Sequence, residues 1–194
     1  MSLLAQPALF DAPAAAPHIR GLTYVADAVS ADDERALACF VETLAFKPFE
    51  WRGFTGNRRT VSFGYRYDFN GGGFQAADAI PEALERARAM VCEQVGEEPA
   101  LYEQCSVIEY APGAGIGWHK DRPHFEKVAG LSLLAPCRFR FRRQRENEGW
   151  ERRAVFLARR SAYLLNGEAR HIWQHSIAPM RELRYSITFR TLSR

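Results

Sequence analysis

The chain has 194 residues, of which 47% are hydrophobic and 25% are charged, and its net charge is +3. These values are ordinary for a soluble globular protein, and no run of about 18 apolar residues is present to span a bilayer. The length suits one domain with a real core and is too short for two domains with a linker. We therefore expect a single domain over residues 21–194 and no membrane partner.

Residues 1–20 are predicted to form an N-terminal tail, because residues 1–17 are rich in Ala and Pro. They have no basic segment ahead of an apolar stretch and so do not resemble a secretory signal. The 4 cysteines lack Cys-x-x-Cys spacing and mostly stand among apolar neighbours, which is typical of buried thiols in a reducing compartment. We therefore expect a cytoplasmic protein.

Two helices are expected in the first half of the chain. Ser30 followed by Asp33 is a capping pair for a helix through about Phe46, whose apolar residues recur at helical spacing: Leu37, Phe40, Val41 and Leu44. A second helix is expected from Glu82 to Val95, with Pro81 at its start and an apolar side formed by Leu84, Ala87 and Val91. Both helices should back the main sheet.

The stretch between these helices, from Trp51 to Phe74, is rich in aromatic residues and arginines. Rings that stack on bases, beside arginines that meet phosphates, are what binding of single-stranded or flipped bases requires. An ordinary hairpin packed on a core has the same composition, so composition alone leaves both readings open. The Gly71-Gly72-Gly73 run is a flexible turn. The residues concerned are Trp51, Phe54, Phe63, Tyr65, Tyr67, Phe69 and Phe74, with Arg52, Arg58, Arg59 and Arg66.

From about Gln104 onward the sequence has the pattern of short strands broken by Pro, Gly and charged turns. Helices first and many strands afterwards favour an α+β or jelly-roll plan. The expected strands are 104–110, 129–135, 137–143, 152–157, 161–166, 171–177 and 183–190.

Charge is unevenly divided along the chain. Residues 1–118 hold 9 Lys and Arg against 16 Asp and Glu, a net −7, whereas residues 119–194 hold 17 against 7, a net +10. A basic half attracts phosphates, and would attract an acidic small molecule too. The alternative is a solvated strand face, since Arg138, Arg140 and Arg142 alternate with Phe139 and Phe141.

The basic half contains a candidate metal site. His119 and Asp121 are two residues apart, so on an extended segment they point to one side, roughly 6.5 Å apart along the strand. Two imidazoles and one carboxylate form the facial set of non-haem Fe(II) oxygenases, which leaves other positions open for chemistry. A Gly- and Pro-rich loop at 111–118 precedes His119 and permits close backbone approach to a bound ion or ligand.

The third ligand has to come from another strand. His124 lies beyond Pro123, which should turn the chain, and its spacing from Asp121 places it off the shared face. His171 and His175 would share one strand face about 13 Å apart, so only one of them can reach a given ion. Spacing alone does not choose between these two histidines.

Five sequence blocks follow one another in the C-terminal half: Tyr110, then Gly117-Trp118-His119-Lys120-Asp121, then Ala129-Gly130-Leu131-Ser132-Leu133, then Trp173-Gln174-His175-Ser176-Ile177, then Arg184 to Arg190. In this order they resemble the AlkB family of Fe(II)/2-oxoglutarate dioxygenases. A further block, Arg59 to Tyr67, is similar to the family's nucleotide-recognition lid. The resemblance therefore covers nearly all of the chain after about residue 20.

The resemblance implies an α+β fold: a double-stranded β-helix (jelly roll) with helices backing the major sheet and an N-terminal nucleotide-recognition lid. The lid would occupy about 51–74 and the catalytic core about 104–192. The resemblance also implies that Fe(II) is bound through His119, Asp121 and His175. His171 is then left as a capping or packing residue.

The implied cosubstrate is 2-oxoglutarate, with Arg184 on its distal carboxylate, Arg190 near its iron end and Tyr110 also in contact. A dicarboxylate needs a planar, permanently charged, bidentate partner, which guanidinium supplies. Arg184, Ser186, Thr188 and Arg190 share one face of the last strand. The alternative is a solvated strand face, but with the metal motif present we favour a cosubstrate cavity.

The function that the resemblance implies is oxidative demethylation of N-alkylated bases in single-stranded DNA or RNA, using O2 and releasing succinate, CO2 and formaldehyde, and we expect the protein to be a monomer. Damaged or unpaired bases cost least to extrude. Tyr65 and Tyr67 are the expected substrate contacts, with Arg58 and Arg59 beside them. The alternatives are the same oxidation of a protein side chain or small molecule, and a non-catalytic nucleic-acid-binding β-barrel.

Three positions depart from the family pattern. Ile108 stands where the family often has Asn, so one hydrogen bond to 2-oxoglutarate is missing or comes from elsewhere. Ser186 replaces an Asn common in close relatives. Pro123 stands where several members carry an acidic residue that helps to read the damaged base, so base preference does not carry over.

Overall fold

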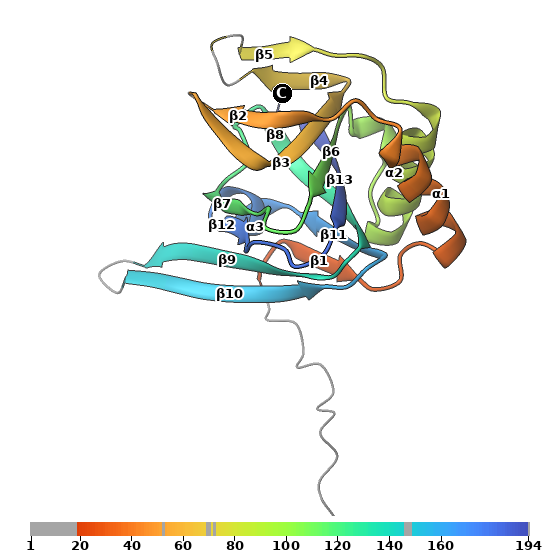
Figure 1. Ribbon diagram of the computed structural model, residues 1–194. Coiled ribbons are helices and arrows are strands. Elements are labelled where there is room, and N and C mark those ends of the chain that lie inside the picture. Colours follow the sequence, from red (N-terminus) through yellow and green to blue (C-terminus); the bar gives the residue numbers. More distant parts are fainter. Residues whose placement is uncertain (1–18, 52, 69–70, 72, 146–148, 194) are drawn as a thin grey trace, which may run out of the picture.

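Two antiparallel sheets form the body of the molecule in the computed structural model, which describes residues 19–51, 53–68, 71, 73–145 and 149–193 (Figure 1). Most of the predicted N-terminal tail, with Arg52 and Phe69, lies outside the described residues. Within that part of the chain, the large sheet has the order β1 (Leu22–Val25), β11 (Ser161–Leu165), β8 (Phe125–Leu134), β13 (Arg184–Leu192), β6 (Gln104–Tyr110), β3 (Phe54–Phe63) and β2 (Lys47–Trp51).

The small sheet has the order β10 (Gly149–Leu157), β9 (Cys137–Arg145), β12 (Gln174–Ile177) and β7 (Ile116–His119). A separate hairpin, β4 (Tyr65–Asp68) with β5 (Gly73–Ala76), lies within and just beyond the predicted lid. Buried residues of both sheets, such as Tyr110, Val128, Phe139 and Val155, form one cluster between them. The fold is the expected double-stranded β-helix.

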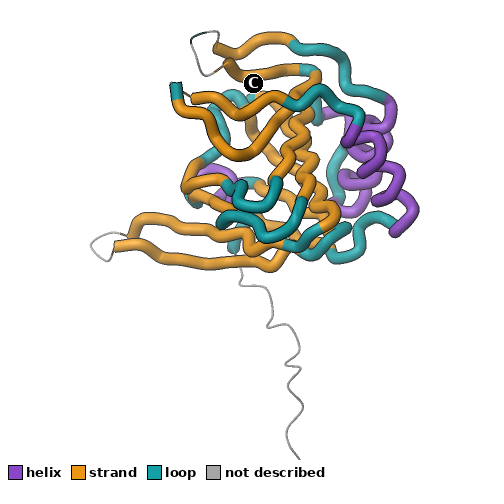
Figure 2. Tube along the Cα trace, viewed as in Figure 1, coloured by secondary structure: helices purple, strands orange, loops and turns teal. Residues whose placement is uncertain are grey.

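Two helices cover the outer face of the large sheet, and Figure 2 shows them together on one side of the strands. α1 (Ala31–Glu42) begins with the predicted capping box between Ser30 and Asp33. It ends four residues before Phe46, where the Thr43 hydroxyl donates a hydrogen bond to the carbonyl oxygen of Phe40. α2 (Glu82–Val95) has the predicted bounds, with Pro81 as its N-cap and Gly96 in the left-handed conformation at its C-terminal end. The predicted apolar stripes pack against the sheet, with Leu37, Val41, Leu84, Ala87 and Val91 buried and Phe40 and Leu44 partly buried.

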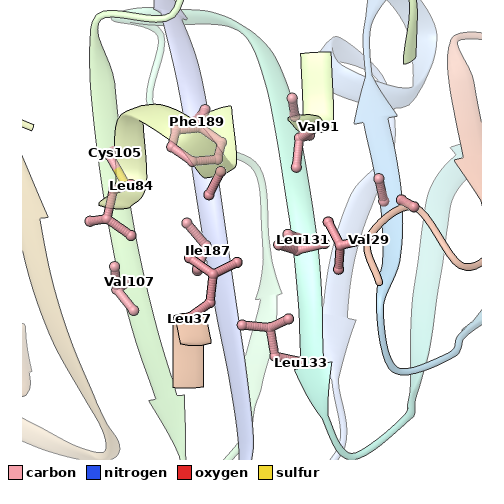
Figure 3. Packing of buried hydrophobic residues seen from close by; sticks show 14 of the residues in the cluster. Val29, Leu37, Leu84, Val91, Cys105, Val107, Leu131, Leu133, Ile187 and Phe189 are labelled. Atoms are coloured by element: carbon pink, nitrogen blue, oxygen red, sulfur yellow. The ribbon is translucent and has the colours of Figure 1, made fainter. Parts of the chain in front are cut away.

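The main core lies between the helices and the large sheet (Figure 3). Leu84 and Val91 of α2 and Leu37 of α1 meet side chains from three central strands: Val107 of β6, Leu131 and Leu133 of β8, and Ile187 and Phe189 of β13. Tyr185, Ile187 and Phe189 therefore point to the helices, as alternation along the last strand predicts. The opposite face of β13 is left for the interior of the jelly roll.

The remaining strands differ from the sequence prediction mainly at their ends. β8 begins at Phe125, four residues before the predicted start, and β1 and β7 were not predicted as strands. The strand predicted from His171 begins only at Gln174, because Asn166 caps a short helix, α3 (Gly167–His171), by accepting a hydrogen bond from Gly167 N. A 3-10 turn, η1 (Pro99–Leu101), precedes β6. No helix among the described residues is long and apolar enough to cross a membrane.

The buried carboxylate of Glu34 connects α1 to the turn between β8 and β9. It accepts hydrogen bonds from Leu134 N at 2.9 Å and from Arg159 Nη2 at 2.5 Å, and Leu134 has a positive φ of 69°. Glu34→Ala should lower the free energy of unfolding by about 2–3 kcal/mol, because the partly buried Leu134 N–H and the Arg159 guanidinium both lose their acceptor. Denaturant unfolding measures this loss. Glu42→Ala, an exposed position at the end of the same helix, should change stability by less than about 0.5 kcal/mol; equal losses would contradict the role given to Glu34.

Candidate active site

Strands β7 and β12 bring two histidines together at one edge of the small sheet. His119 ends β7 and is paired with His175 of β12 in the antiparallel register. Their ring centroids are 4.3 Å apart, and His175 also lies against the rings of Phe139 and Phe141. Cross-strand partners share a face, so both imidazoles face the space between the two sheets.

Asp121 follows β7 in the loop to β8 and joins these histidines. Its Oδ2 lies 3.5 Å from His175 Nε2, and its Oδ1 accepts a hydrogen bond of 3.0 Å from Arg190 Nε. Burial alone would raise the pKa of the Asp121 carboxyl, but its interactions with nearby groups, of which that with Arg190 is the largest, hold the pKa below its ordinary value. The carboxyl is therefore ionised, as a metal ligand has to be.

Both histidines are prepared to donate a lone pair. Nδ1 of His119 lies 2.9 Å from the carbonyl oxygen of Gly117, and because a carbonyl only accepts, this nitrogen carries the proton and Nε2 is left free. Burial lowers the pKa of His175 to about 3, and the His119 ring adds to this effect. Burial also lowers the pKa of His119. Neutral imidazoles are the form that binds metal.

The distance between two of the three side chains is already that of neighbouring ligands in a metal site. Donor atoms bound to one ion at about 2.1 Å lie about 3–3.5 Å apart, so the contact between His175 and Asp121 already has the required length. The ring of His119 is in direct contact with the ring of His175. No three His, Cys, Asp or Glu side chains of the described chain have their donor atoms already arranged as a complete cluster. Binding of one ion by all three residues would therefore require their donor atoms to move closer together.

The two competing histidines lie elsewhere. His171 ends α3, where its Nε2 is 2.8 Å from Glu126 Oε1 in an exposed pair. His124 lies against the rings of Tyr67 and Phe74. The structure thus brings His175, and neither of these, to His119 and Asp121.

A buried arginine that sequence analysis missed holds the loop that carries Asp121. Arg170 of α3 donates from Nη2 to the carbonyl oxygens of Arg122 at 2.7 Å and Phe125 at 2.5 Å. Arg170 is buried, and its charge also lowers the pKa of Asp121. Sequence analysis missed this role because it did not predict α3. The only sign of a helix there was Asn166 followed by Gly167, and a strand was expected from residue 171.

Arg184 is the most unusual side chain of the interior. It is fully buried, its Nε donates to Ser132 Oγ at 3.0 Å, and its guanidinium lies 5.3 Å from the centre of the Tyr110 ring. Nη1 and Nη2 have no hydrogen-bond partner among the described residues. A buried charge with two parallel unpaired donors is costly unless an anion completes it, and a carboxylate matches its bidentate geometry.

Two residues of the block at 129–133 make room for this arginine and its surroundings. Ser132 supplies the hydroxyl that accepts from Arg184, and it lies opposite Ser186 in the sheet. A Cβ on Gly130 would lie 2.3 Å from the ring of the buried Tyr163, so only glycine permits that ring to lie across β8. Gly115, in the loop before β7, must also be glycine, because a Cβ there would lie only 2.8 Å from the carbonyl oxygen of Ile177. The close backbone approach predicted for this loop is thus made to another strand.

The polar face of β13 lies inside the jelly roll as expected. Arg190 donates to Asp121, to Gln104 Oε1 at 2.9 Å and to Thr188 Oγ1 at 3.0 Å. It therefore touches a candidate iron ligand directly, and Gln104, which sequence analysis did not single out, helps to fix it. Burial raises the pKa of Tyr110, although Arg184 opposes this effect, so the phenol keeps its proton and can donate it to an anion.

The departures from the family pattern have plain surroundings. Ile108 lies opposite Ser186 in the register and packs against the cluster between the sheets. Its side chain has no polar atom that could donate a hydrogen bond to 2-oxoglutarate. Ser186 is buried beside Ser132. Pro123 lines a pocket of about 360 Å³ together with Phe74, His124, Leu192 and Ser193.

The hairpin of β4 and β5 places aromatic side chains above the loop that follows Asp121. Tyr65 stacks on Phe74 with ring centroids 5.1 Å apart. Tyr67 lies 5.7 Å from the His124 ring, and the guanidinium of Arg122 lies 4.5 Å from the centre of the Tyr67 ring. The predicted lid residues Tyr65 and Tyr67 therefore lie beside the segment that carries the candidate metal carboxylate.

The two lid arginines point in different directions. The guanidinium of Arg58 lies 3.6 Å from the centre of the Phe49 ring. Its charge lowers the pKa of Tyr110 and of His119, so Arg58 lies on the side of the candidate metal site. Arg59 forms a bidentate pair with Glu109 at 2.7 Å on the helix side of the large sheet. The expectation that Arg59 contacts substrate conflicts with this placement, because β3 directs its neighbouring side chains to opposite faces.

Comparison with known proteins defines the class. The model of the 2OG-Fe(II) oxygenase superfamily matches residues 20–190, so the chain belongs to that superfamily. Its members use Fe(II) and 2-oxoglutarate, and the protein is an Fe(II)/2-oxoglutarate-dependent dioxygenase.

Within this class the chain is AlkB-like. It is 28% identical to alpha-ketoglutarate-dependent dioxygenase AlkB of Salmonella typhimurium over 66% of this chain and 67% of that protein. It is 27% identical to the Mus musculus tRNA (carboxymethyluridine(34)-5-O)-methyltransferase ALKBH8 over 83% of this chain, but it spans only 24% of that longer protein. The solved structure of OsALKBH1 shares the fold with a TM-score of 0.66 and 16% identity, over 90% of this chain and 98% of the other.

The residues present fit both cofactors. The pair of unpartnered Arg184 donors suits the distal carboxylate of 2-oxoglutarate, which lies at one end of a short dicarboxylate. Two neutral imidazoles and an ionised carboxylate suit Fe(II). Fe(II) with 2-oxoglutarate supplies O2 activation and two-electron oxidation of a bound substrate.

Proposed function

We propose that this protein oxidatively demethylates N-alkylated bases of single-stranded DNA or RNA, with release of succinate, CO2 and formaldehyde. In this proposal His119, Asp121 and His175 hold Fe(II), and Arg184 holds the distal carboxylate of 2-oxoglutarate. Tyr110, Ser186, Thr188 and Arg190 complete the cosubstrate cavity. The observation that carries the proposal is the aromatic lid hairpin, which lies beside the loop of a candidate iron ligand.

Each of the chain's own groups has a defined task in this reaction. Arg190 and Arg170 position Asp121 and its loop before the cofactors bind. Arg184 and Tyr110 orient the cosubstrate by donating hydrogen bonds to its carboxylates. Tyr65 and Tyr67 are the rings on which an extruded base would stack, with Phe74 and Arg122 as their neighbours, and a damaged or unpaired base costs least to extrude.

The names of two relatives support a nucleic-acid target. A tRNA-modifying enzyme and an alkylated DNA repair homologue share 27% and 28% identity with this chain. The metal and cosubstrate residues themselves are silent about the target, because they serve the same oxidation on any substrate. The lid is therefore the part of the molecule to test.

A panel of singly methylated single-stranded DNA and RNA oligonucleotides tests the proposal. With Fe(II), 2-oxoglutarate and O2, at least one of them should give formaldehyde and the unmodified base in equal amounts, detected by mass spectrometry. The unmethylated oligonucleotides are the matched controls. Succinate formation without formaldehyde from every oligonucleotide would contradict the proposal and favour a protein side chain or small molecule as substrate.

Replacing Tyr67 separates the substrate site from the cofactor site. Tyr67→Ala should lower kcat/KM for the methylated oligonucleotide by about 10- to 100-fold, because one stacking partner is lost. The affinity for 2-oxoglutarate should stay unchanged, since Arg184 is not altered. The slow conversion of 2-oxoglutarate to succinate in the absence of an oligonucleotide should also stay unchanged. Steady-state kinetics with both substrates measures this split. A matching loss in 2-oxoglutarate affinity would show that Tyr67 supports the fold of the site and does not contact the base.

A further inference from the structure

The outer face of the small sheet carries a row of arginines and tryptophans. The register places Arg138, Arg140 and Arg142 of β9 on the same side as their β10 partners, opposite to the buried Phe139 and Phe141. Trp118 of β7 lies on this side too, because its neighbour His119 faces the interior. We name this surface the Arg-Trp face, formed by Trp118, Arg138, Arg140, Arg142, Trp150 and Arg152.

Arg142 lies at the centre of the Arg-Trp face between two indole rings. Its guanidinium is 4.6 Å from the centre of the Trp118 ring and 4.1 Å from that of Trp150, and its Nε donates to Gln174 Oε1 at 2.7 Å. The guanidinium of Arg140 lies 5.2 Å from Trp118. These contacts hold the cations and rings in a fixed layer across three strands.

Within the described part of the chain, the arginines of this face differ from their neighbours in lacking acidic partners. Among the described residues, none of Arg138, Arg140, Arg142 and Arg152 forms an ion pair, and Arg140 Nε is buried without a hydrogen bond. The remaining arginines of the same hairpin behave differently. Arg143, Arg145 and Arg153 are all paired with Glu151, which faces the other side.

The exposed parts of the face are open to a partner. Arg138 and Arg152 are exposed, Trp150 is 37% exposed, and Phe156, which lies opposite Arg138, is 64% exposed. Unpaired guanidinium groups fit phosphates, and exposed rings fit the faces of bases. A lipid surface or an acidic protein would also be attracted by the arginines, and the competition experiments below distinguish these partners from nucleic acid.

We propose that the Arg-Trp face is a second binding surface for single-stranded nucleic acid, which contacts the phosphodiester backbone and stacks on bases that flank the target. Its role in catalysis rests on the proposed function, whereas binding itself does not. Trp118 and His119 are neighbours on the edge strand β7, so the face and the candidate metal site lie on the two sides of one strand. A single-stranded nucleic acid that passes around this edge of the sheet can contact both the Arg-Trp face and the candidate metal site.

The test compares two double variants with equal charge change. Arg138→Gln/Arg152→Gln removes two exposed cations of the face, and Arg35→Gln/Arg86→Gln removes two exposed cations of the helix layer. Fluorescence anisotropy measures binding of an unmodified single-stranded oligonucleotide of about twenty nucleotides, longer than the roughly 4–16 that a small domain covers. The face variant should bind about tenfold more weakly, with a salt slope reduced by about 1.4 for two lost phosphate contacts. The helix variant should match the parent.

A third variant, Trp150→Ala, tests stacking and should weaken binding by about tenfold with the salt slope little changed. Unchanged binding by both face variants would overturn the proposal. Equal displacement of the oligonucleotide by polyglutamate, or by vesicles of anionic lipid, would also overturn it, since the face would then select charge alone.

Failure of this inference is distinguishable from failure of the proposed function. If methylated oligonucleotides give formaldehyde while both face variants bind normally, the face is wrong and the activity stands. If no oligonucleotide gives formaldehyde while the face variants lose binding, the face stands and the activity is wrong. Circular dichroism and thermal unfolding of each variant confirm that the sheet is intact.

Discussion

His175→Ala should bind Mn(II), used as a redox-stable substitute for Fe(II), at least about 100-fold more weakly than the parent. Loss of an orienting residue outside the coordination sphere already costs about 10- to 100-fold, and His175 is placed to be a ligand itself. Succinate formation from 2-oxoglutarate should fall to background. Isothermal titration with the metal and a succinate assay measure the two effects.

His171→Ala is the matched control, since it removes a histidine four residues away that pairs with Glu126. It should keep the metal affinity and turnover of the parent. Asp121→Asn, which preserves the shape of the side chain, should lose metal as His175→Ala does and so excludes collapse of a cavity as the cause. Parent-like metal binding by His175→Ala with a loss in His171→Ala would overturn the choice of the third ligand.

Arg184→Met should abolish measurable use of 2-oxoglutarate, with an affinity at least about 100-fold lower. Removing one partner of a buried charge pair costs about 2–5 kcal/mol, and roughly 3 kcal/mol corresponds to this factor. The cofactor-free variant should unfold at the same temperature as the parent or above it, because methionine removes a buried charge whose Nη1 and Nη2 have no partner among the described residues. Thermal unfolding with and without 2-oxoglutarate measures both quantities.

Arg184→Lys gives the second half of this test. It keeps the charge but not the two parallel donors, so it should bind 2-oxoglutarate far more weakly than the parent. A clear drop in the stability of cofactor-free Arg184→Met would show that Arg184 mainly stabilises the fold. Retained 2-oxoglutarate affinity in both variants would exclude Arg184 as the carboxylate-binding residue.

Much of the fold follows from local patterns. The capping pair at Ser30, the apolar stripes of both helices and the alternation of the last strand predicted where these elements lie and which faces are buried. The short helix α3 was missed because five residues give too little periodicity to separate a helix from a strand end. β1 was missed because its four residues are defined by pairing with β11 and not by their own pattern.

The candidate site was predictable to the extent that its residues stand close together in short motifs. Spacing could not choose between His171 and His175, whereas the register between β7 and β12 places only His175 opposite His119. Arg170 and Gln104 were missed because their partners are 48 and 86 residues away in the chain. Arg59 was assigned to the substrate because sequence analysis did not reveal its pairing with Glu109 across the sheet.

A crystal structure of the protein with Mn(II) and 2-oxoglutarate tests the central claim most directly. We expect one ion within about 2.0–2.3 Å of His119 Nε2, an Asp121 carboxylate oxygen and His175 Nε2. The distal carboxylate of 2-oxoglutarate should accept two hydrogen bonds from Nη1 and Nη2 of Arg184. An ion bound by other residues, or a cosubstrate that leaves Arg184 without a carboxylate, would contradict this account.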